Sequence, residues 1–230
     1  MSDSDRWRRS LPARAAVHAA LGEPLRLAIV DELAVSDRSP KELGERLGVT
    51  SNLLAHHLDV LEGVGLVARS VSSGDARRRY VRLVADQAPL VAPPPRRQQR
   101  EMLFLCTHNS ARSQLAAALW EARSGRPARS AGTEPADRVH PGAVRAARRV
   151  GLSLAAARPR KLAAIPKRPQ VVTVCDRAHE ELAPTAAWWH WSIPDPVDDG
   201  SDRAFDAVVD ELEARIRSVL RGHGERRERA

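Results

Sequence analysis

The sequence predicts two domains, a small and mainly helical one followed by an α/β domain with a short parallel sheet. Residues 14–84 carry apolar side chains at helical spacing and end in two alternating stretches. Residues 87–100 contain four prolines and then a polar, basic run, which fits neither a helix nor a central strand. From Glu101 onward, short apolar runs alternate with helical patterns. We therefore expect domains at residues 1–86 and 101–230, joined by a linker at 87–100.

Composition limits the classes of function. The chain has 230 residues and only two cysteines, Cys106 and Cys175, so a disulfide scaffold is excluded and a reducing cytoplasm is the expected location. We find no signal peptide and no long apolar span. The formal net charge of +8 is compatible with nucleic-acid binding but does not establish it.

The first domain is predicted to contain three or four short helices and then a β-hairpin. Its helices are expected from Arg14 to Leu21, from Pro24 to Leu33, from Ser39-Pro40 to the stop at Gly48, and after the N-cap Thr50 as far as Gly63–Gly65. Leu66–Val71 and Arg77–Val84 alternate like two strands around a Ser-Ser-Gly-Asp turn. This order is the layout of a winged helix-turn-helix.

The fourth helix would present polar side chains to a DNA major groove, and the hairpin would bring arginines to the phosphates. The DNA-binding candidates are Ser51, Asn52, Ala55, His56, Arg77, Arg78 and Arg79. The run from Ser51 to Val67 resembles the recognition helix of the arsenical-resistance repressor family, and the resemblance covers residues 14–84. It implies binding to operator DNA, with a homodimer as the expected form. A docking or stabilising role without DNA is the alternative, which we disfavour because the hairpin arginines otherwise have no evident partner.

The first domain departs from that family in two ways. Residues 1–105 contain no cysteine, so the family's metalloid-sensing cysteines have no counterpart. The proline linker replaces the dimer helix that often follows the hairpin, so the sequence does not indicate which surface would form the dimer. His56 and His57 are adjacent on a helix and therefore point about 100° apart, so we expect groove contact or packing from them and no shared metal ion.

The second domain opens with a pattern that predicts an anion site carrying a nucleophile. Met102–Leu105 reads as a buried strand, Cys106 follows, and a loop of small polar residues leads through Arg112 into a helix. Backbone N–H groups and the helix dipole then converge on one point, where Arg112 can bind two oxygens of a tetrahedral oxyanion. We expect this setting to lower the pKa of Cys106 and to favour its thiolate.

Strands at Leu103–Leu105, Ala128–Ser130 and Val171–Val174 are expected to alternate with helices, which indicates a parallel, three-layer sheet. The expected helices are Ser113–Ser124, His140–Val150 and Phe205–Leu220. Cys106, Cys175 and Asp195 would lie at the carboxyl ends of strands, where such sheets bind ligands.

This half resembles the low-molecular-weight tyrosine phosphatase family and, within it, the arsenate reductases. The matching segments are Cys106–Gln114, Ser130–Glu134, Gly151–Leu154 with Arg158–Leu162, Val171–Asp176 and His190–Pro196. The resemblance implies attack by Cys106 on arsenate, with Arg112 and Ser113 stabilising the thiolate and Asp195 as general acid. An ordinary turn is the alternative for Asp195. Thr107, His108, Asn109, Ser110 and Ala111 complete the expected oxyanion loop, and Asn109 would hold its shape.

Arsenite release needs a second thiol, for which the resemblance offers only Cys175. The next cysteine of the thioredoxin-linked relay is missing, since that stretch reads Glu181-Leu-Ala-Pro184, and the cysteine inside the loop of some members is Ala111. Either an external thiol such as mycothiol or glutathione attacks the arseno-cysteine, or Cys175 does. A thioredoxin or mycoredoxin would then restore the enzyme. Cys175 as a plain core residue stays equally open.

Several neighbouring residues are ambiguous. His108 would add a donor to the loop or shape its entrance, and the cluster Trp188, Trp189 and Trp191 reads first as core packing and second as a docking wall for a redoxin. The spacings of His140, His179 and His190 do not suggest a zinc site, and we predict neither a metal nor a bound cofactor. Ala117 stands where related reductases can carry an acidic residue near a potassium site, which argues against that ion.

Two other functions remain open on the sequence alone. The same fold serves protein tyrosine phosphatases, although the His190–Pro196 run leans toward arsenate. A transcriptional regulator whose second domain senses an oxyanion or a redox state, without turning it over, is the third reading, because the first domain lacks sensing cysteines.

Overall fold

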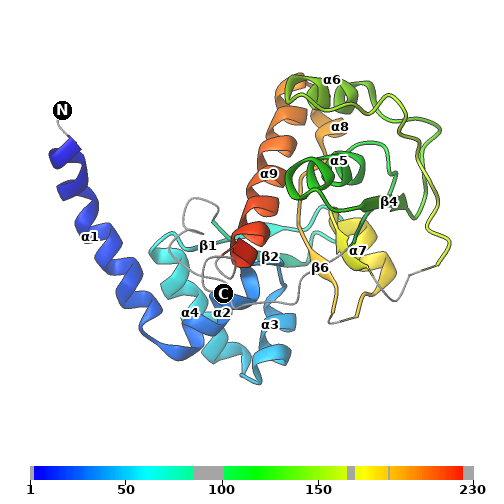
Figure 1. Ribbon diagram of the computed structural model, residues 1–230. Coiled ribbons are helices and arrows are strands. Elements are labelled where there is room, and N and C mark those ends of the chain that lie inside the picture. Colours follow the sequence, from blue (N-terminus) through cyan, green and yellow to red (C-terminus); the bar gives the residue numbers. More distant parts are fainter. Residues whose placement is uncertain (1–2, 85–100, 165–168, 186, 225–230) are drawn as a thin grey trace. The chain divides into compact units, whose positions relative to one another are not determined.

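The computed structural model describes residues 3–84, 101–164, 169–185 and 187–224 of the chain (Figure 1). They divide into two compact units: the first includes residues 3–70 and 79–84, and the second includes residues 71–78, 101–164, 169–185 and 187–224. The predicted linker at 87–100 lies outside the described residues. Among the described helices, none has the length and apolar character that a membrane span requires.

The first unit is the helix-turn-helix domain. Its helices are α1 (Asp3–Leu21), α2 (Pro24–Leu33), α3 (Pro40–Leu47) and α4 (Ser51–Gly63), followed by strands β1 (Val67–Val71) and β2 (Arg79–Leu83). The predicted elements are confirmed, except that α1 begins upstream of Arg14 and contains Pro12. A core of aliphatic side chains, each at most 1% exposed, holds the helices and β2 together: Ile29, Val30, Leu33, Leu43, Leu54, Leu58, Leu61 and Val81.

The helix ends of this unit show which sequence signals were informative. Ser39 and Glu42 form a reciprocal capping box, and Gly48 ends α3 in the left-handed conformation at φ 66°. Thr50 occupies the N-cap position of α4, as predicted, but its side chain makes no capping hydrogen bond.

The second unit contains a four-stranded parallel sheet in the order β4-β3-β5-β6 (Figure 1). The strands are β3 (Met102–Cys106), β4 (Ala128–Gly132), β5 (Gln170–Thr173) and β6 (Trp189–His190), and the helices are α5 (Arg112–Ser124), α6 (Pro141–Arg149), α7 (Asp176–Leu182), α8 (Pro196–Asp199) and α9 (Asp202–Gly224). The α/β prediction is confirmed, while α7, β6 and α8 were not predicted. Because parallel strands end at one edge of the sheet, the ends of β3, β4 and β5 meet.

The sheet lies between α5 and α7. Phe104 of β3 packs against Trp120 of α5, with ring centroids 6.4 Å apart. Leu103 and Leu105, on the other face, form an apolar cluster with Leu182 of α7. Helix α9 packs against α5, α6 and α8 on the Trp120 side (Figure 1). The fully buried strand β3 thereby carries the Cys106 loop on a rigid base.

Candidate active site

The loop after β3 forms the centre of the candidate site. Cys106 is the last residue of β3 and pairs in register with Gly132 of β4, while Arg112 is the first residue of α5. The loop between them includes buried Thr107, Asn109 and Ala111 and exposed His108. The strand, loop and helix start therefore occur in the order that the sequence predicts.

The sulfur of Cys106 receives one polar contact from this loop and one from the first turn of α5. The backbone N–H of Asn109 donates to Sγ at 3.1 Å, and Ser113 Oγ lies 3.0 Å from it. Asn109 Nδ2 donates to Ser113 Oγ at 2.7 Å, so the serine oxygen acts as an acceptor there and its hydroxyl proton is left for the sulfur.

The ionisation of Cys106 differs from the expectation. Burial and the proximity of Cys175 raise the pKa of Cys106 above its ordinary value, and they outweigh the hydrogen bond of Ser113 and the charge of Arg112. The side chain is only 3% exposed. The prediction of a lowered pKa was wrong because motif spacing carries no information about how deeply the sulfur is buried.

Asn109 fixes the shape of the loop. Its φ of 47° lies in the left-handed region, which Asn tolerates better than most residues. Gln114 Nε2 donates to its backbone oxygen at 3.0 Å and to Oδ1 at 3.1 Å, and the backbone N–H of Arg160 donates to Oδ1 at 2.8 Å. Sequence reasoning assigned Asn109 this role but missed Gln114 and Arg160, although both lie inside the motifs that carry the family resemblance.

Gly132 lets β4 approach the loop. A Cβ at this position would overlap the backbone oxygen of Thr107 and would lie 3.0 Å from Asn109 Cβ. The backbone of Gly132 is also held from the other side, by Arg160 O and by the N–H of Leu162, each at 2.8 Å. Only a residue without a side chain fits between these two neighbours.

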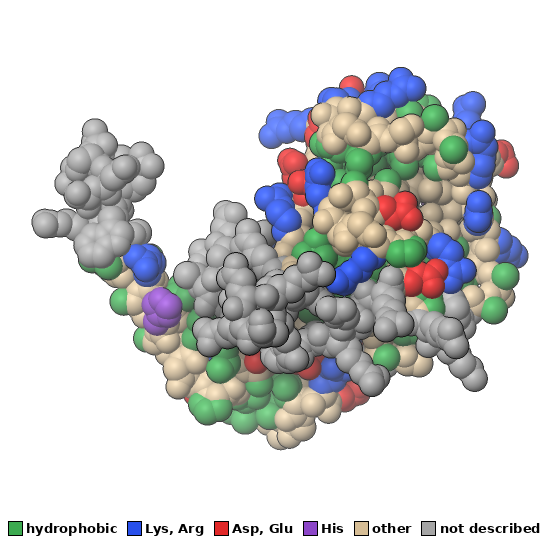
Figure 2. Space-filling model, in the orientation of Figure 1, with side chains coloured by type: hydrophobic (Ala, Val, Ile, Leu, Met, Phe, Trp, Pro, Cys, Tyr) green, Lys and Arg blue, Asp and Glu red, His purple; other side chains and the backbone are tan. Residues whose placement is uncertain are grey.

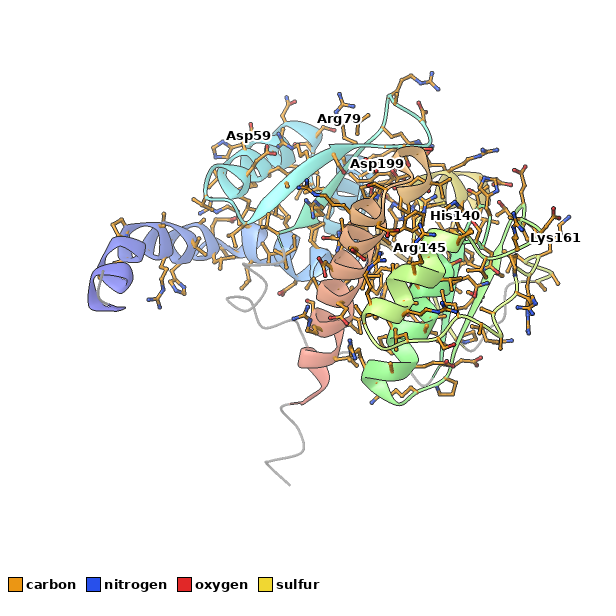
Figure 3. The ribbon with its side chains drawn as sticks, turned by 90° about the horizontal axis from the view of Figure 1, so that it is seen from above. Asp59, Arg79, His140, Arg145, Lys161 and Asp199 are labelled. Carbon is orange, nitrogen blue, oxygen red and sulfur yellow. The ribbon has the colours of Figure 1, made fainter. Side chains whose placement is uncertain are left out.

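The remaining loop residues contact the segment after β4. His108 Nδ1 lies 3.1 Å from the backbone oxygen of Glu134. Ser110 O accepts from the backbone N–H of His140 at 2.8 Å, and His140 caps α6 through its own Nδ1. Figure 3 shows His140 at the start of this helix. The loop is therefore tied to β4 and α6 as well as to α5.

Arg112 and Asp195 meet, although 83 positions separate them. Arg112 Nη2 pairs with Asp195 Oδ2, and Nη1 donates to the backbone oxygen of Ile193 at 3.0 Å. Asp195 also accepts from the N–H of Val197 and so caps α8. The predicted acid and the predicted oxyanion-binding arginine are thus brought together beside the loop.

Cys175 lies next to the candidate nucleophile. It follows β5, caps α7 by accepting from the N–H of Ala178 at 3.3 Å, and is 1% exposed. Oγ1 of Thr107, the residue after Cys106, is 3.4 Å from the sulfur of Cys175. Both sulfurs therefore occupy the same edge of the sheet, as expected from parallel strands.

The tryptophan cluster belongs to the core. Trp188, Trp189 and Trp191 are 7%, 4% and 1% exposed, and Trp191 packs on Phe104 with centroids 5.8 Å apart. This agrees with core packing and not with a docking wall. Within the parts of the chain that the structure describes, no group of three or more His, Cys, Asp or Glu residues is arranged to hold a metal ion.

The candidate DNA-binding residues of α4 lie on its exposed side. Ser51, Asn52, Ala55 and His56 are exposed, whereas His57 is buried with Nδ1 3.4 Å from Glu23 Oε2. The side chains that the sequence assigns to the major groove are thus open to solvent.

The hairpin arginines differ from the expectation in one respect. Arg77 donates to both carboxylate oxygens of Asp75, at 3.1 and 3.2 Å. Arg78 Nε also lies 4.0 Å from Asp75 Oδ2. The prediction that the hairpin arginines lack a partner was wrong, because the turn supplies its own acid. On the face of the molecule seen in Figure 2, Lys and Arg side chains are spread widely and do not gather in one patch.

Two family models match separate parts of the chain. Residues 101–228 match the family model of low molecular weight phosphotyrosine protein phosphatases, and residues 21–69 match a helix-turn-helix domain model. None of the curated protein sequences matches the chain.

Solved structures similar to the chain include enzymes of two activities. An arsenate reductase from Archaeoglobus fulgidus is 31% identical over 53% of this chain and 98% of its own, with a TM-score of 0.43. A thioredoxin-dependent arsenate reductase from Corynebacterium glutamicum is 28% identical over 60% of this chain and 65% of its own, with a TM-score of 0.44. The tyrosine phosphatase Wzb from Escherichia coli K30 is 25% identical over 55% of this chain and 100% of its own, with a TM-score of 0.49.

Proposed function

Because the chain belongs to the low molecular weight phosphotyrosine protein phosphatase family, we propose that its second domain reduces arsenate through Cys106. The helix-turn-helix domain fused to it would bind operator DNA and regulate arsenic resistance. Phosphoryl transfer and arsenate reduction share their first step on this fold, so the second step decides between them.

The observation that carries the proposal is the second buried sulfur. A phosphatase needs only a nucleophile, an oxyanion site and an acid, and Cys106, Arg112 and Asp195 supply these. Reduction of arsenate additionally needs a thiol that can attack the arsenylated sulfur. The position of the Cys175 sulfur, 3.4 Å from Oγ1 of the residue next to Cys106, supports this role for it.

The proposed chemistry balances with these groups. After the Cys106 thiol has lost its proton to solvent, its sulfur attacks hydrogen arsenate and a sulfur–arsenic bond forms as an arsenic–oxygen bond breaks. The displaced hydroxide takes a proton from the Asp195 carboxyl and leaves as water, and Asp195 is left as a carboxylate. A second thiol then attacks Cys106 Sγ, the sulfur–arsenic bond breaks, and its electron pair stays on arsenic. Arsenic(V) becomes arsenite, the attacking thiol's proton goes to that oxyanion, and the two sulfurs become a disulfide.

Two thiols fit the second step. If Cys175 attacks, the product is a Cys106–Cys175 disulfide, which a thioredoxin-type protein reduces. If mycothiol or glutathione attacks, the product is a mixed disulfide on Cys106, which a mycoredoxin or glutaredoxin reduces. The short distance between Cys175 and the loop favours the internal attack.

A tyrosine phosphatase is the second candidate, because the matched family is described by that activity. Nothing in phosphatase chemistry requires Cys175, so its loss would leave that activity in place. This difference gives the test its discriminating variant.

The test measures anaerobic arsenite production together with hydrolysis of p-nitrophenyl phosphate. Thioredoxin with its reductase, mycothiol with mycoredoxin, and glutathione with glutaredoxin are supplied in parallel to the wild type, Cys106→Ser and Cys175→Ser. We expect Cys106→Ser to abolish both activities, and Cys175→Ser to abolish thioredoxin-linked arsenite production alone. Full arsenate turnover by Cys106→Ser would refute the proposal, and aryl phosphate hydrolysis without arsenate turnover by the wild type would favour the phosphatase.

A further inference from the structure

Four buried polar side chains near Cys175 have no part in the proposed reaction. They are Thr173 at the end of β5, Asp176 and His179 in α7, and His190 at the end of β6, and none is more than 3% exposed. Burying several polar groups costs free energy unless their hydrogen bonds are satisfied, so this cluster is not ordinary core.

The cluster is continuously hydrogen-bonded. Thr173 Oγ1 lies 2.8 Å from His179 Nδ1 and 2.9 Å from His190 Nδ1, and His190 Nε2 lies 3.1 Å from Asp176 Oδ1. The two imidazoles also stack, with centroids 4.0 Å apart at an interplanar angle of 22°. Four side chains from three elements are thus held in one arrangement.

The charge of Asp176 sets the direction of its hydrogen bond with His190. Burial opposes its ionisation, but the hydrogen bond and charge of His190 prevail and hold the pKa of Asp176 below its usual value. An ionised carboxylate can only accept, so His190 Nε2 donates to it. The Thr173 hydroxyl donates to Trp189 O at 3.3 Å, and its oxygen lies within hydrogen-bond distance of Nδ1 of both His179 and His190.

This cluster joins the two segments that the proposed reaction must align. Thr173 and Asp176 flank Cys175 on one segment, and His190 begins the other, which continues to Ile193 and Asp195. The backbone pairing of these segments is short: β5 and β6 match at two positions, and the Trp191 N–H donates to Thr173 O at 2.8 Å. Hydrogen bonds between side chains therefore add to this short backbone pairing in holding the segment from His190 to Asp195 beside Cys175.

We propose that His190, bound to Asp176, is a positioning residue that fixes Cys175 at reacting distance and angle to Cys106. His190 itself touches neither sulfur; it acts by holding the start of α7 against the segment that leads to Asp195. The proposal rests on the proposed function in that Cys175 is taken as the thiol that attacks Cys106.

Two substitutions at this position separate positioning from mere filling of space. His190→Gln retains an amide donor that reaches toward Asp176, whereas His190→Asn retains a group near Nδ1 and loses that reach. The readout is the rate of Cys106–Cys175 disulfide formation, measured by mass spectrometry of alkylated peptides. Arsenate drives it in one arm and the thiol oxidant diamide in the other, in the full-length protein.

We expect His190→Asn to slow disulfide formation about tenfold in both arms, the size expected for losing a hydrogen bond to a buried charge. His190→Gln should restore most of the rate. Alkylation of Cys106 by iodoacetamide should change less than about twofold in either variant, since its contacts come from the loop and α5 and a tenfold change would need more than 1 kcal/mol.

The outcomes distinguish the two proposals. Equal slowing in both variants, or slowing of Cys106 alkylation to the same degree, would overturn the positioning role and indicate a packing residue. A disulfide formed with diamide but not with arsenate would contradict arsenate reduction. The diamide rates of the two His190 variants would then still show whether His190 positions Cys175. Absence of the disulfide in the wild type with both reagents would show that Cys175 is not held within reach, which also overturns the role of His190.

Discussion

Replacing Gly132 by alanine should damage the active loop more than it damages the fold. The new Cβ would overlap Thr107 O and would lie 3.0 Å from Asn109 Cβ and 3.1 Å from Asn109 N. Because Gly132 is bonded to Arg160 and Leu162 on its other side, the strand cannot retreat freely and the loop must move. Overpacking of this kind costs about 1–3 kcal/mol of stability. A misplacement of about 1 Å in an active site can cost about a hundredfold in rate.

The matched control is Gly151→Ala in the same unit. Gly151 has a φ of 77° and its added Cβ would meet nothing within 4 Å, so this variant carries only the strain of a left-handed residue, about 1 kcal/mol. Denaturant unfolding followed by tryptophan fluorescence gives both stabilities, and p-nitrophenyl phosphate hydrolysis gives the rate. We expect both variants to lose stability and only Gly132→Ala to lose activity. A Gly132→Ala enzyme with wild-type stability and rate would refute the reasoning.

Ser113→Ala in a Cys175→Ser background removes a hydroxyl 3.0 Å from the Cys106 sulfur, where it favours the thiolate. The pKa of Cys106 should rise further, and the midpoint of its pH-dependent alkylation should move to higher pH; a move to lower pH would contradict the assignment. Asn52→Ala on the exposed face of α4 should weaken operator binding by about 1–3 kcal/mol, measured by fluorescence anisotropy. Equal weakening on scrambled DNA would argue against base contact. Arg77→Ala should leave sequence preference unchanged and reduce the salt slope by about 1; an unchanged slope would indicate that Arg77 serves only Asp75.

The sequence predicted elements whose signals are local and repeated. Ser39-Pro40 and the glycine stop at Gly48 marked both ends of α3, and long apolar periods marked α4 and α9. Helix α7, with seven residues, α8, with four, and β6, with two, are too short to show a period. The start of α1 was missed because the amphipathic pattern begins only at Arg14, whereas the helix itself begins at Asp3 and includes Pro12.

In the candidate site too, contacts within one short segment could be predicted, whereas contacts between distant segments could not be predicted from local patterns. Cys106 and Arg112 share one loop, so motif spacing sufficed to relate them. The pairing of Arg112 with Asp195 was accessible only through the family resemblance, since no local rule connects such distant positions. The cluster around His190 escaped notice because its histidines were weighed only as metal ligands, and its bonds run between three elements that a linear spacing cannot relate.

The burial of both sulfurs constrains the electron donor. Cys106 and Cys175 are 3% and 1% exposed, yet thiol–disulfide exchange requires direct access of the attacking sulfur to its target. A small thiol needs only a narrow path to the loop, whereas a redoxin must bring its own surface against the disulfide. Cys175 accepts from the N–H of Ala178 in the first turn of α7, so we expect a protein thiol to reach this sulfur only when that turn moves. The same turn contains Asp176, the partner of His190. A comparison of small-thiol with redoxin donors therefore reports on the mobility of α7 as well as on the identity of the reductant.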